Sequence, residues 1–142
     1  MPLKIIDHGT KEYKQMVEMR LQILRKPLGL TFTDDELEKE KNDLLIGAFE
    51  EDEMLGCCML TKAGLRTVRL RQMAVKTGLQ GKGIGRVMMQ FAENNARDRG
   101  NTRIIMHARK TAIGFYEKLG YSVSGEEFEE VTIPHYEMEK KL

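Results

Sequence analysis

The residues with the clearest chemical meaning form a glycine-rich loop in the middle of the chain. The segment Gln80-Gly81-Lys82-Gly83-Ile84-Gly85-Arg86 lies between a predicted strand and a predicted amphipathic helix. N–H groups at a helix start lack intrahelical partners, glycine lets a ligand approach the main chain, and the helix dipole favours an anion. No carboxylate occurs from residue 76 to residue 92. The segment therefore predicts a phosphate-binding cradle flanked by Lys82 and Arg86; the alternative is a glycine turn that only packs tightly.

Two familiar phosphate-binding motifs do not fit this spacing. A Walker A loop places Lys directly after its last glycine, but Gly83, which stands at that position relative to Gly78, is followed by Ile84. A dinucleotide fingerprint has two residues between its second and third glycines, whereas glycines 81, 83 and 85 alternate evenly. A P-loop NTPase and a Rossmann domain are both disfavoured.

The strand before the loop has an irregular apolar pattern. Val68 and Leu70 fall on even positions, but Met73 and Val75 fall on odd ones. A strand repeats every two residues, so this change of phase predicts a β-bulge near Arg71-Gln72. Its unpaired N–H and C=O groups would be able to pair with an amide-bearing ligand. The alternative is a strand that ends early.

The remaining elements follow from hydrophobic periodicity and from capping and turn residues. The strand, glycine loop, helix and strand between residues 66 and 108 predict a right-handed parallel crossover. In chain order we expect a strand at 3–6, helices at 13–24 and from 33, a hairpin of strands 44–49 and 54–60, a strand at 66–75, a helix at 84–96, a strand at 102–108, a helix at 111–119, a strand at 121–124, an acidic loop at 125–132 and a last strand at about 135–139.

Two motifs resemble one known family. Gln80-x-x-Gly83-x-Gly85 is similar to the Gln/Arg-x-x-Gly-x-Gly/Ala motif of the GNAT superfamily of acyl-CoA-dependent N-acyltransferases, and residues 112–121, AIGFYEKLGY, are similar to its A-x-x-F-Y-x-K-x-G-F segment. Residues 133–135 with Met138 resemble the small bacterial stand-alone members, including the ElaA-like ones. The resemblance implies an α/β (α+β) fold. In it a mixed, mostly antiparallel sheet of about six to seven strands carries a parallel splayed pair in the middle and about four flanking helices. Residues 1–142 would form one N-acetyltransferase domain.

The resemblance also implies roles for individual residues. Acetyl-CoA would be the cosubstrate, with its pyrophosphate on the glycine loop and its pantetheine arm along the bulged strand, where one N–H would polarise the thioester carbonyl. Tyr116 would protonate the departing thiolate as general acid; the alternative is an aromatic residue that packs beside Phe115. Arg109 replaces a family Asn, and it or Lys110 would reach a phosphate. The residues expected to bind the coenzyme are Met73, Ala74, Val75, Gln80, Gly81, Lys82, Gly83, Ile84, Gly85, Arg86, Arg109 and Tyr116.

The general base is harder to locate in the sequence. Many family members carry Glu on the strand before the loop, but Arg69 and Arg71 occupy those positions here. His107 and His135 are the groups in the second half of the chain whose ordinary pKa lies near neutrality. His107 is the candidate catalytic residue; the alternatives are a structural histidine and a chain of waters.

The acceptor is expected to be an amine on a small molecule or a peptide. An acidic lip would attract a cationic amine, although a solvated loop is the simpler interpretation of it. Arg20 and Arg25 would instead suit an acidic acceptor, so the substrate stays open. The acidic lip consists of Glu126, Glu127, Glu129 and Glu130.

Composition excludes several other classes of function. With 23 Lys+Arg against 22 Asp+Glu the net charge is +1, which disfavours a nucleic-acid binder, and no apolar run is long enough to span a membrane. Cys57 and Cys58 are sequence neighbours whose Cα atoms, about 3.8 Å apart, are too close for an ordinary disulfide. The three scattered histidines show no metal-ligand spacing, so we expect no metal and a cytoplasmic protein.

The oligomeric state is open between monomer and homodimer. A second hypothesis is a coenzyme-A-binding sensor or partner-binding module without turnover, since the strand carboxylate is missing.

Overall fold

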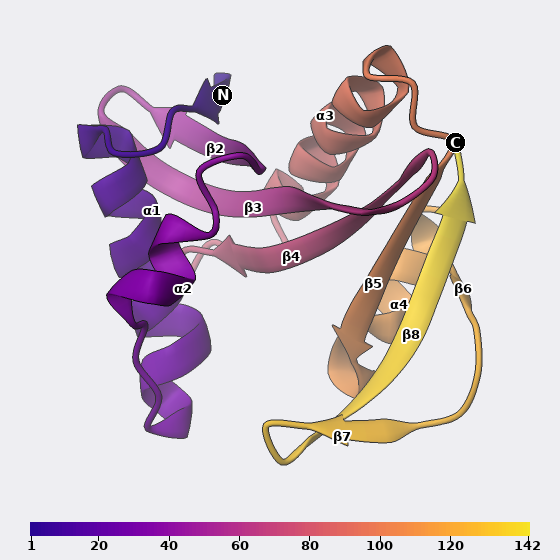
Figure 1. Ribbon diagram of the computed structural model, residues 1–142. Helices are drawn as coiled ribbons and strands as arrows, with labels where there is room; N and C mark the ends of the chain where they lie inside the picture. The colour runs from indigo at the N-terminus through magenta and orange to yellow at the C-terminus, as the bar shows by residue number, and fades with distance from the viewer. The chain divides into compact units, whose positions relative to one another are not determined.

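The computed structural model describes residues 1–142 as one mixed sheet with helices (Figure 1). Its elements are β1 Leu3–Ile6, α1 Lys11–Arg20, a π-helical turn Leu21–Arg25, a 3₁₀ turn Lys26–Leu28, α2 Asp34–Glu38, β2 Leu44–Glu50, β3 Glu53–Gly64, β4 Thr67–Val75, α3 Ile84–Asp98, β5 Arg103–Arg109, a 3₁₀ turn Lys110–Ala112, α4 Ile113–Lys118, β6 Ser122–Val123, β7 Phe128–Glu130 and β8 Ile133–Lys141.

The sheet confirms the predicted fold class but has more strands than expected. Its order is β1-β2-β3-β4-β5-β8-β6, with β7 paired to β8, so it contains eight strands rather than six or seven. The extra strand is β7, which lies inside the segment predicted as an acidic loop. The one parallel pair joins Thr67–Leu70 of β4 to Arg103–Met106 of β5, as the crossover predicted.

The chain divides into two compact units. The first unit consists of Met1–Leu60 and Gln72–Ala92, and the second consists of Thr61–Arg71 and Glu93–Leu142. β3, β4 and α3 each begin in one unit and end in the other. That residues 1–142 act as one domain stays a prediction.

The first unit packs helices on both faces of its strands. Met16 of α1 is fully buried against a core that includes Phe49, Cys57 and Ala74. On the other face α3 packs closely, because a Cβ atom added to Gly56 would lie 2.8 Å from Cε of Met88.

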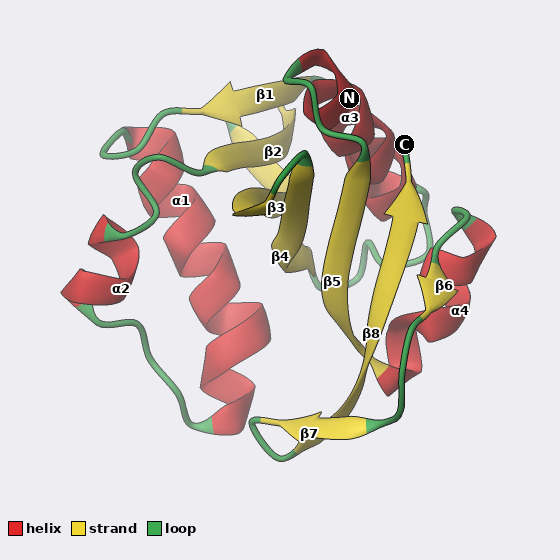
Figure 2. Cartoon of the chain, turned by 45° about the vertical axis from the view of Figure 1, so that its right-hand side comes forward, coloured by secondary structure: helices red, strands yellow, loops and turns green.

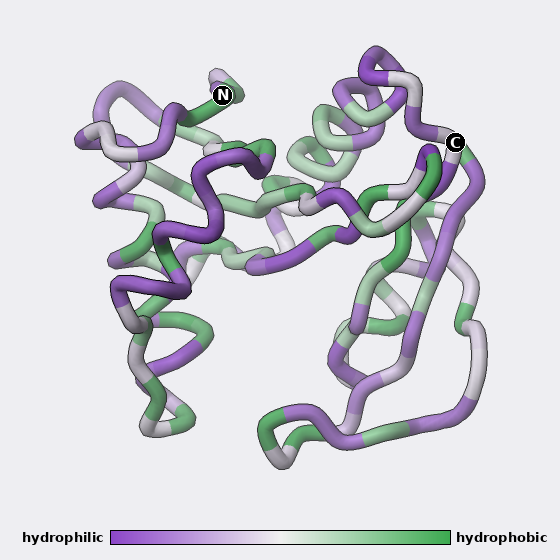
Figure 3. Tube along the Cα trace, viewed as in Figure 1, coloured by the Kyte–Doolittle hydropathy of each residue, from purple (hydrophilic) through white to green (hydrophobic).

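The helix termini of the first unit follow local sequence signals. The helix expected from residue 33 is α2, where Thr33 and Glu36 form a capping box; the hydrophilic residues of α2 are visible in Figure 3. The first helix was expected to continue to residue 24, but it changes at Leu21 into the wider π-helical turn.

The second unit is organised around β8. This strand pairs antiparallel with β5, β6 and β7, and it is longer than predicted. Figure 2 shows β5 and β8 side by side, and Figure 1 shows α4 behind them. Lys140 of β8 donates to Glu93 of α3 at 2.9 Å and to the Leu119 carbonyl at 2.7 Å, and Tyr121 donates to Glu93 at 3.0 Å. These bonds fix the helical layer to one face of the β5–β8 pair. No helix of the chain has both the length and the apolar character that a bilayer crossing requires.

Candidate active site

The glycine loop is open to a ligand at its main chain. Gly81 and Gly83 have φ of +81° and +87°, a region that L side chains rarely adopt, and a Cβ atom added at either would meet nothing within 4 Å. The first helical bond at this end of α3 runs from the Val87 N–H to the Gly83 carbonyl at 3.1 Å. The N–H groups of residues 84–86 precede it and therefore have no intrahelical acceptor. Lys82 and Arg86 are exposed beside them.

Gln80 shapes this loop through its own side chain. Its Nε2 donates to the Val75 carbonyl and its Oε1 accepts the Gly78 N–H, each at 3.0 Å. The amide thus ties the end of β4 to the loop. A direct contact between Gln80 and the coenzyme stays a prediction.

The expected irregularity of β4 is present at Gln72. This residue has φ of +55° inside the strand, a left-handed break at the position where the bulge is predicted. Beyond it Ala74 is buried in the α1 core, whereas Met73 and Val75 are only half-buried.

The backbone groups after the bulge point to two different edges. The Gln72 carbonyl accepts a hydrogen bond from the Cys57 thiol of β3 at 3.8 Å, and the Ala74 N–H donates to the same sulfur. Because backbone groups alternate along a strand, those of Met73 and Val75 turn toward the edge away from β3. Of the three predicted pantetheine contacts, Met73 therefore presents its N–H and carbonyl and Val75 its N–H, whereas the Val75 carbonyl already accepts from Gln80 and the N–H of Ala74 is already bonded.

A buried ion pair lies behind this part of β4. Arg20 donates to both carboxylate oxygens of Glu40, at 2.8 and 2.6 Å, and the Tyr13 hydroxyl donates to Glu40 at 2.9 Å. Burial and then the hydrogen bond to Glu40 raise the pKa of Tyr13. Arg20, offered by the sequence with Arg25 as one alternative for an acidic acceptor, has a fully buried side chain and does not reach the surface. The available signal was its spacing, since Arg20 shares the helical stripe of Tyr13 and Met16.

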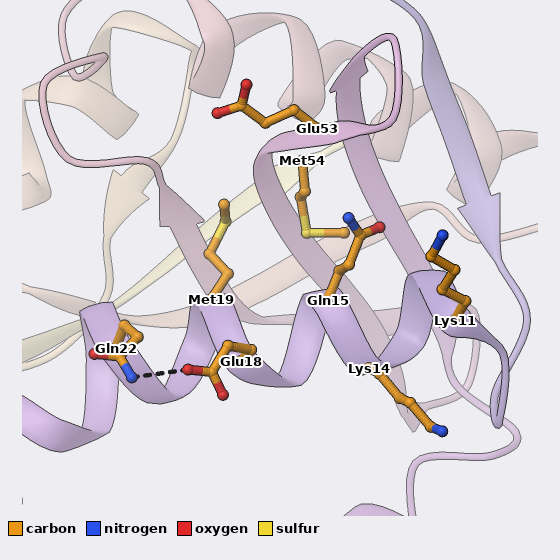
Figure 4. Close-up of a pocket in the computed structure, with 8 residues that line it drawn as sticks. All are labelled: Lys11, Lys14, Gln15, Glu18, Met19, Gln22, Glu53 and Met54. Atoms are coloured by element: carbon orange, nitrogen blue, oxygen red, sulfur yellow. Dashed lines mark hydrogen bonds between the residues drawn. The ribbon is translucent and has the colours of Figure 1, made fainter.

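The first unit also has a shallow surface hollow of about 500 Å³. Figure 4 shows Met19 and Met54 pointing into the space between α1 and β3, while Lys14 points away from it. None of the residues predicted for catalysis or coenzyme binding lines this hollow.

In the second unit Tyr116 lies on α4 and is buried, with 6% of its surface exposed. Its ring packs edge-on against Phe115 at 5.0 Å and Tyr121 at 5.9 Å between centroids. The short helix ends at Lys118, Gly120 follows it with a φ of +95° that suits glycine, and the Tyr121 N–H returns to the Tyr116 carbonyl at 3.1 Å. The fold therefore holds the Tyr116 ring in a fixed orientation.

His107 of β5 has a carboxylate partner. Its Nδ1 lies 3.0 Å from Oε1 of Glu130 on β7, and its ring packs against Phe128 with centroids 5.1 Å apart. A carboxylate only accepts hydrogen bonds, so Nδ1 carries the proton and a neutral ring keeps its lone pair on Nε2. His107 is partly exposed, whereas His135 is buried and is bonded to the Ile133 carbonyl at 2.7 Å.

Sequence reasoning missed the specific role of Glu130. In the sequence Glu130 was recognisable only as one of the four glutamates of the acidic lip. Two of the four are engaged within the unit, Glu130 with His107 and Glu127 with Lys110 at 2.9 Å. The lip therefore has less free negative charge than the sequence implies.

The face of the sheet on which His107 lies follows from register. Lys140 is paired with Ile104 and contacts the end of α4, so the side chain of Ile104 lies on the helical face. Side chains alternate along a strand, which puts His107 and Arg109 on the opposite face. Arg109 is half-buried there. The glycine loop with residues 73–75 thus belongs to the first unit, and His107, Arg109 and Tyr116 belong to the second.

Comparison with known proteins decides the family. A family model described as "Acetyltransferase (GNAT) domain" matches residues 28–142. The chain belongs to the GNAT acetyltransferase family. Among its relatives is the Bacillus subtilis protein YjcF, named as an N-acetyltransferase, which is 33% identical over 139 residues covering 96% of this chain and 97% of YjcF.

Two solved structures share the fold over almost the whole chain. Escherichia coli ElaA superposes with a TM-score of 0.85 at 16% identity, covering 98% of both chains. An aminoglycoside 6'-N-acetyltransferase, solved in complex with coenzyme A, gives a TM-score of 0.81 at 19% identity, covering 99% of this chain and 97% of the other. The predicted family and the predicted acetyltransferase class are both confirmed. The individual roles of the site residues stay predictions.

Proposed function

We propose that this GNAT acetyltransferase transfers an acetyl group from acetyl-CoA to a primary amine by direct attack in a ternary complex. The observation that carries the proposal is the start of α3, where left-handed glycines leave the main chain uncovered beside free N–H groups. Residues 1–142 would act as one domain. Its buried cysteines suit a reducing compartment such as the cytoplasm.

The coenzyme would be held mostly by backbone. The N–H groups of the glycine loop would donate to the pyrophosphate, with Lys82 and Arg86 balancing its charge. Main-chain groups of Met73 and Val75 would pair with the amides of the pantetheine arm. Arg109 would bind a phosphate.

Starting from an ammonium acceptor, the reaction removes two protons from the nitrogen and supplies one to the sulfur. An alkylamine, with a pKa of about 10.4, is almost fully protonated at neutral pH and must lose a proton before it attacks. His107 would accept that proton at Nε2, which Glu130 leaves free. The neutral amine then forms the C–N bond as the C–S bond breaks, and the Tyr116 hydroxyl would donate its proton to the departing sulfur. The second proton of the new amide nitrogen would return through solvent to the Tyr116 phenolate, which restores the acid.

A thiol-release assay against a panel of amines tests the proposal. Release of coenzyme A that depends on the amine, with the acetylated product found by mass spectrometry, is the expected result. Arginines at positions 69 and 71, where many family members carry Glu, motivate the alternative of a coenzyme-binding module without turnover. Tight coenzyme binding with no release for any amine would favour that module.

A further inference from the structure

We infer that the acceptor is an amine that also carries an oxyanion, a carboxylate or a phosphate ester, and that Arg69 and Arg71 bind this oxyanion. The inference rests on the proposed function and adds the chemical class of the acceptor. All residues that carry it belong to the second unit.

Arg69 and Arg71 lie on the same face of the sheet as His107. They are two residues apart on β4, so both side chains project to one side. Arg69 is paired in parallel register with Ile105, and His107 follows two residues later on β5. The two guanidinium groups and the proposed base therefore share the face opposite α4.

Neither arginine has an ion-pair partner within the second unit. Other cations of this unit are paired, for example Arg103 with Glu139, Lys110 with Glu127 and Lys140 with Glu93. Arg69 is half-buried, and its Nε atom is buried without any hydrogen-bond partner. A buried donor left unsatisfied is costly, and two like charges side by side repel each other.

A bound oxyanion would accept a hydrogen bond from the buried Nε atom of Arg69 and would offset the repulsion between the two guanidinium charges. Residues two apart on a strand are separated by about 6.5 Å, a span across which two arginines can bind one carboxylate or phosphate. The planar fork of each guanidinium matches such a group in a bidentate manner.

On the same face, the side of β5 away from β4 suits the amine. Glu137 lies directly across from His107 in the β5–β8 register and has no ion-pair partner within the second unit. Its carboxylate would attract the ammonium form of the acceptor before His107 removes the proton. The face therefore offers negative charge next to the base and positive charge on β4, which fits an acceptor with both groups.

Matched acceptor pairs provide the test. One pair is an α-amino acid and its carboxamide; the other is an amino-sugar phosphate and the free amino sugar. Thiol release gives kcat and KM for each, and calorimetry measures binding of each acceptor to the protein saturated with coenzyme A. We expect the oxyanionic member of one pair to have a KM lower by about tenfold or more. The pair that shows the difference identifies the source of the oxyanion.

Substitution of the arginines connects this preference to the proposed site. Arg69→Gln and Arg71→Gln should each raise KM for the oxyanionic acceptor by about tenfold and leave KM for its neutral partner unchanged, and Lys at either position should restore part of the difference. Arg103→Gln, on the same sheet but already paired with Glu139, is the matched control and should change neither. Arg71 is exposed, so its variant serves if the Arg69 variant does not fold.

Three outcomes separate this inference from the proposed function. Equal KM values within both pairs, or equal losses for charged and neutral acceptors in the arginine variants, would overturn the inference alone. Arginine-dependent binding of the oxyanionic acceptor without thiol release would overturn the proposed function alone. If no acceptor binds and no thiol is released, both the inference and the proposed function would be overturned.

Discussion

The Nδ1 atom of His107 lies 3.0 Å from Oε1 of Glu130. The two residues are 23 positions apart in the chain and come together because β5 and β7 both pair with β8. The contact orients the imidazole and leaves Nε2 available as a proton acceptor.

His107→Ala should therefore lower kcat with acetyl-CoA and an amine by about 10²–10⁴-fold, the usual contribution of a positioned general base. Imidazole added to the assay should restore part of the turnover, because it can replace the missing ring. Full turnover in the variant would remove His107 from the reaction.

Glu130→Ala should lower kcat more than it raises KM, since the carboxylate orients the base. Glu130→Gln should retain more activity, because its amide oxygen can still accept the hydrogen bond from the Nδ1–H group of His107. Glu126→Gln is the control from the same acidic segment. Equal losses in the Ala and Gln variants would contradict a role through this hydrogen bond.

Tyr116→Phe should lower kcat by about 10²–10⁴-fold with little change in coenzyme affinity, because only the hydroxyl proton is lost and the ring still packs against Phe115 and Tyr121. Steady-state kinetics and calorimetry measure the two quantities. A variant with wild-type turnover would exclude Tyr116 as the acid.

Gly83→Glu should abolish binding of acetyl-CoA in calorimetry, because the side chain and its charge would occupy the anion cradle. Gly78→Glu is the matched control: Gly78 has nearly the same φ, +89° against +87°, and equally open surroundings, so the backbone strain is comparable. It lies before the helix start and should retain affinity. Unchanged affinity in the Gly83 variant would refute the cradle.

Cys57 and Cys58 should resist thiol reagents in the native protein. Both are fully buried, and burial raises the pKa of Cys57 to about 12 and that of Cys58 as well. Both should react once urea unfolds the chain. The free energy of unfolding should fall as pH rises from about 9 toward 12, because the unfolded thiols ionise while the folded ones do not. Rapid labelling of the native protein at neutral pH would contradict this prediction.

Glu40→Gln should reduce the free energy of unfolding by about 3–5 kcal/mol, because it leaves the Arg20 guanidinium buried without its counter-charge. The double variant Arg20→Met with Glu40→Leu should lose less, since neither charge is then buried. Urea denaturation measures both. Glu36→Gln, which breaks the more exposed pair of Glu36 with Arg25, is the control and should cost much less. A larger loss in the double variant would mean that the ion pair itself stabilises the core.

Local features were predicted well from the sequence. The helix start at Thr33, the glycine loop with an accessible main chain and the break at Gln72 each depend on residue types or periodicity over a few positions. β7 was missed, because two of its three residues are charged and it forms a strand only by pairing with β8.

The sequence by itself determined the family, the candidate anion-binding start of α3 and the chemical candidates His107 and Tyr116, since these depend on motifs and on residues close together in the chain. Only the tertiary structure decided which residues contact each other across the chain: Glu130 is the partner of His107, Glu40 of Arg20, and Cys57 of the bulged backbone of β4. Such contacts join residues distant in the chain. Strand pairing and core packing select them, and no local pattern along the chain specifies which carboxylate or thiol will be the partner.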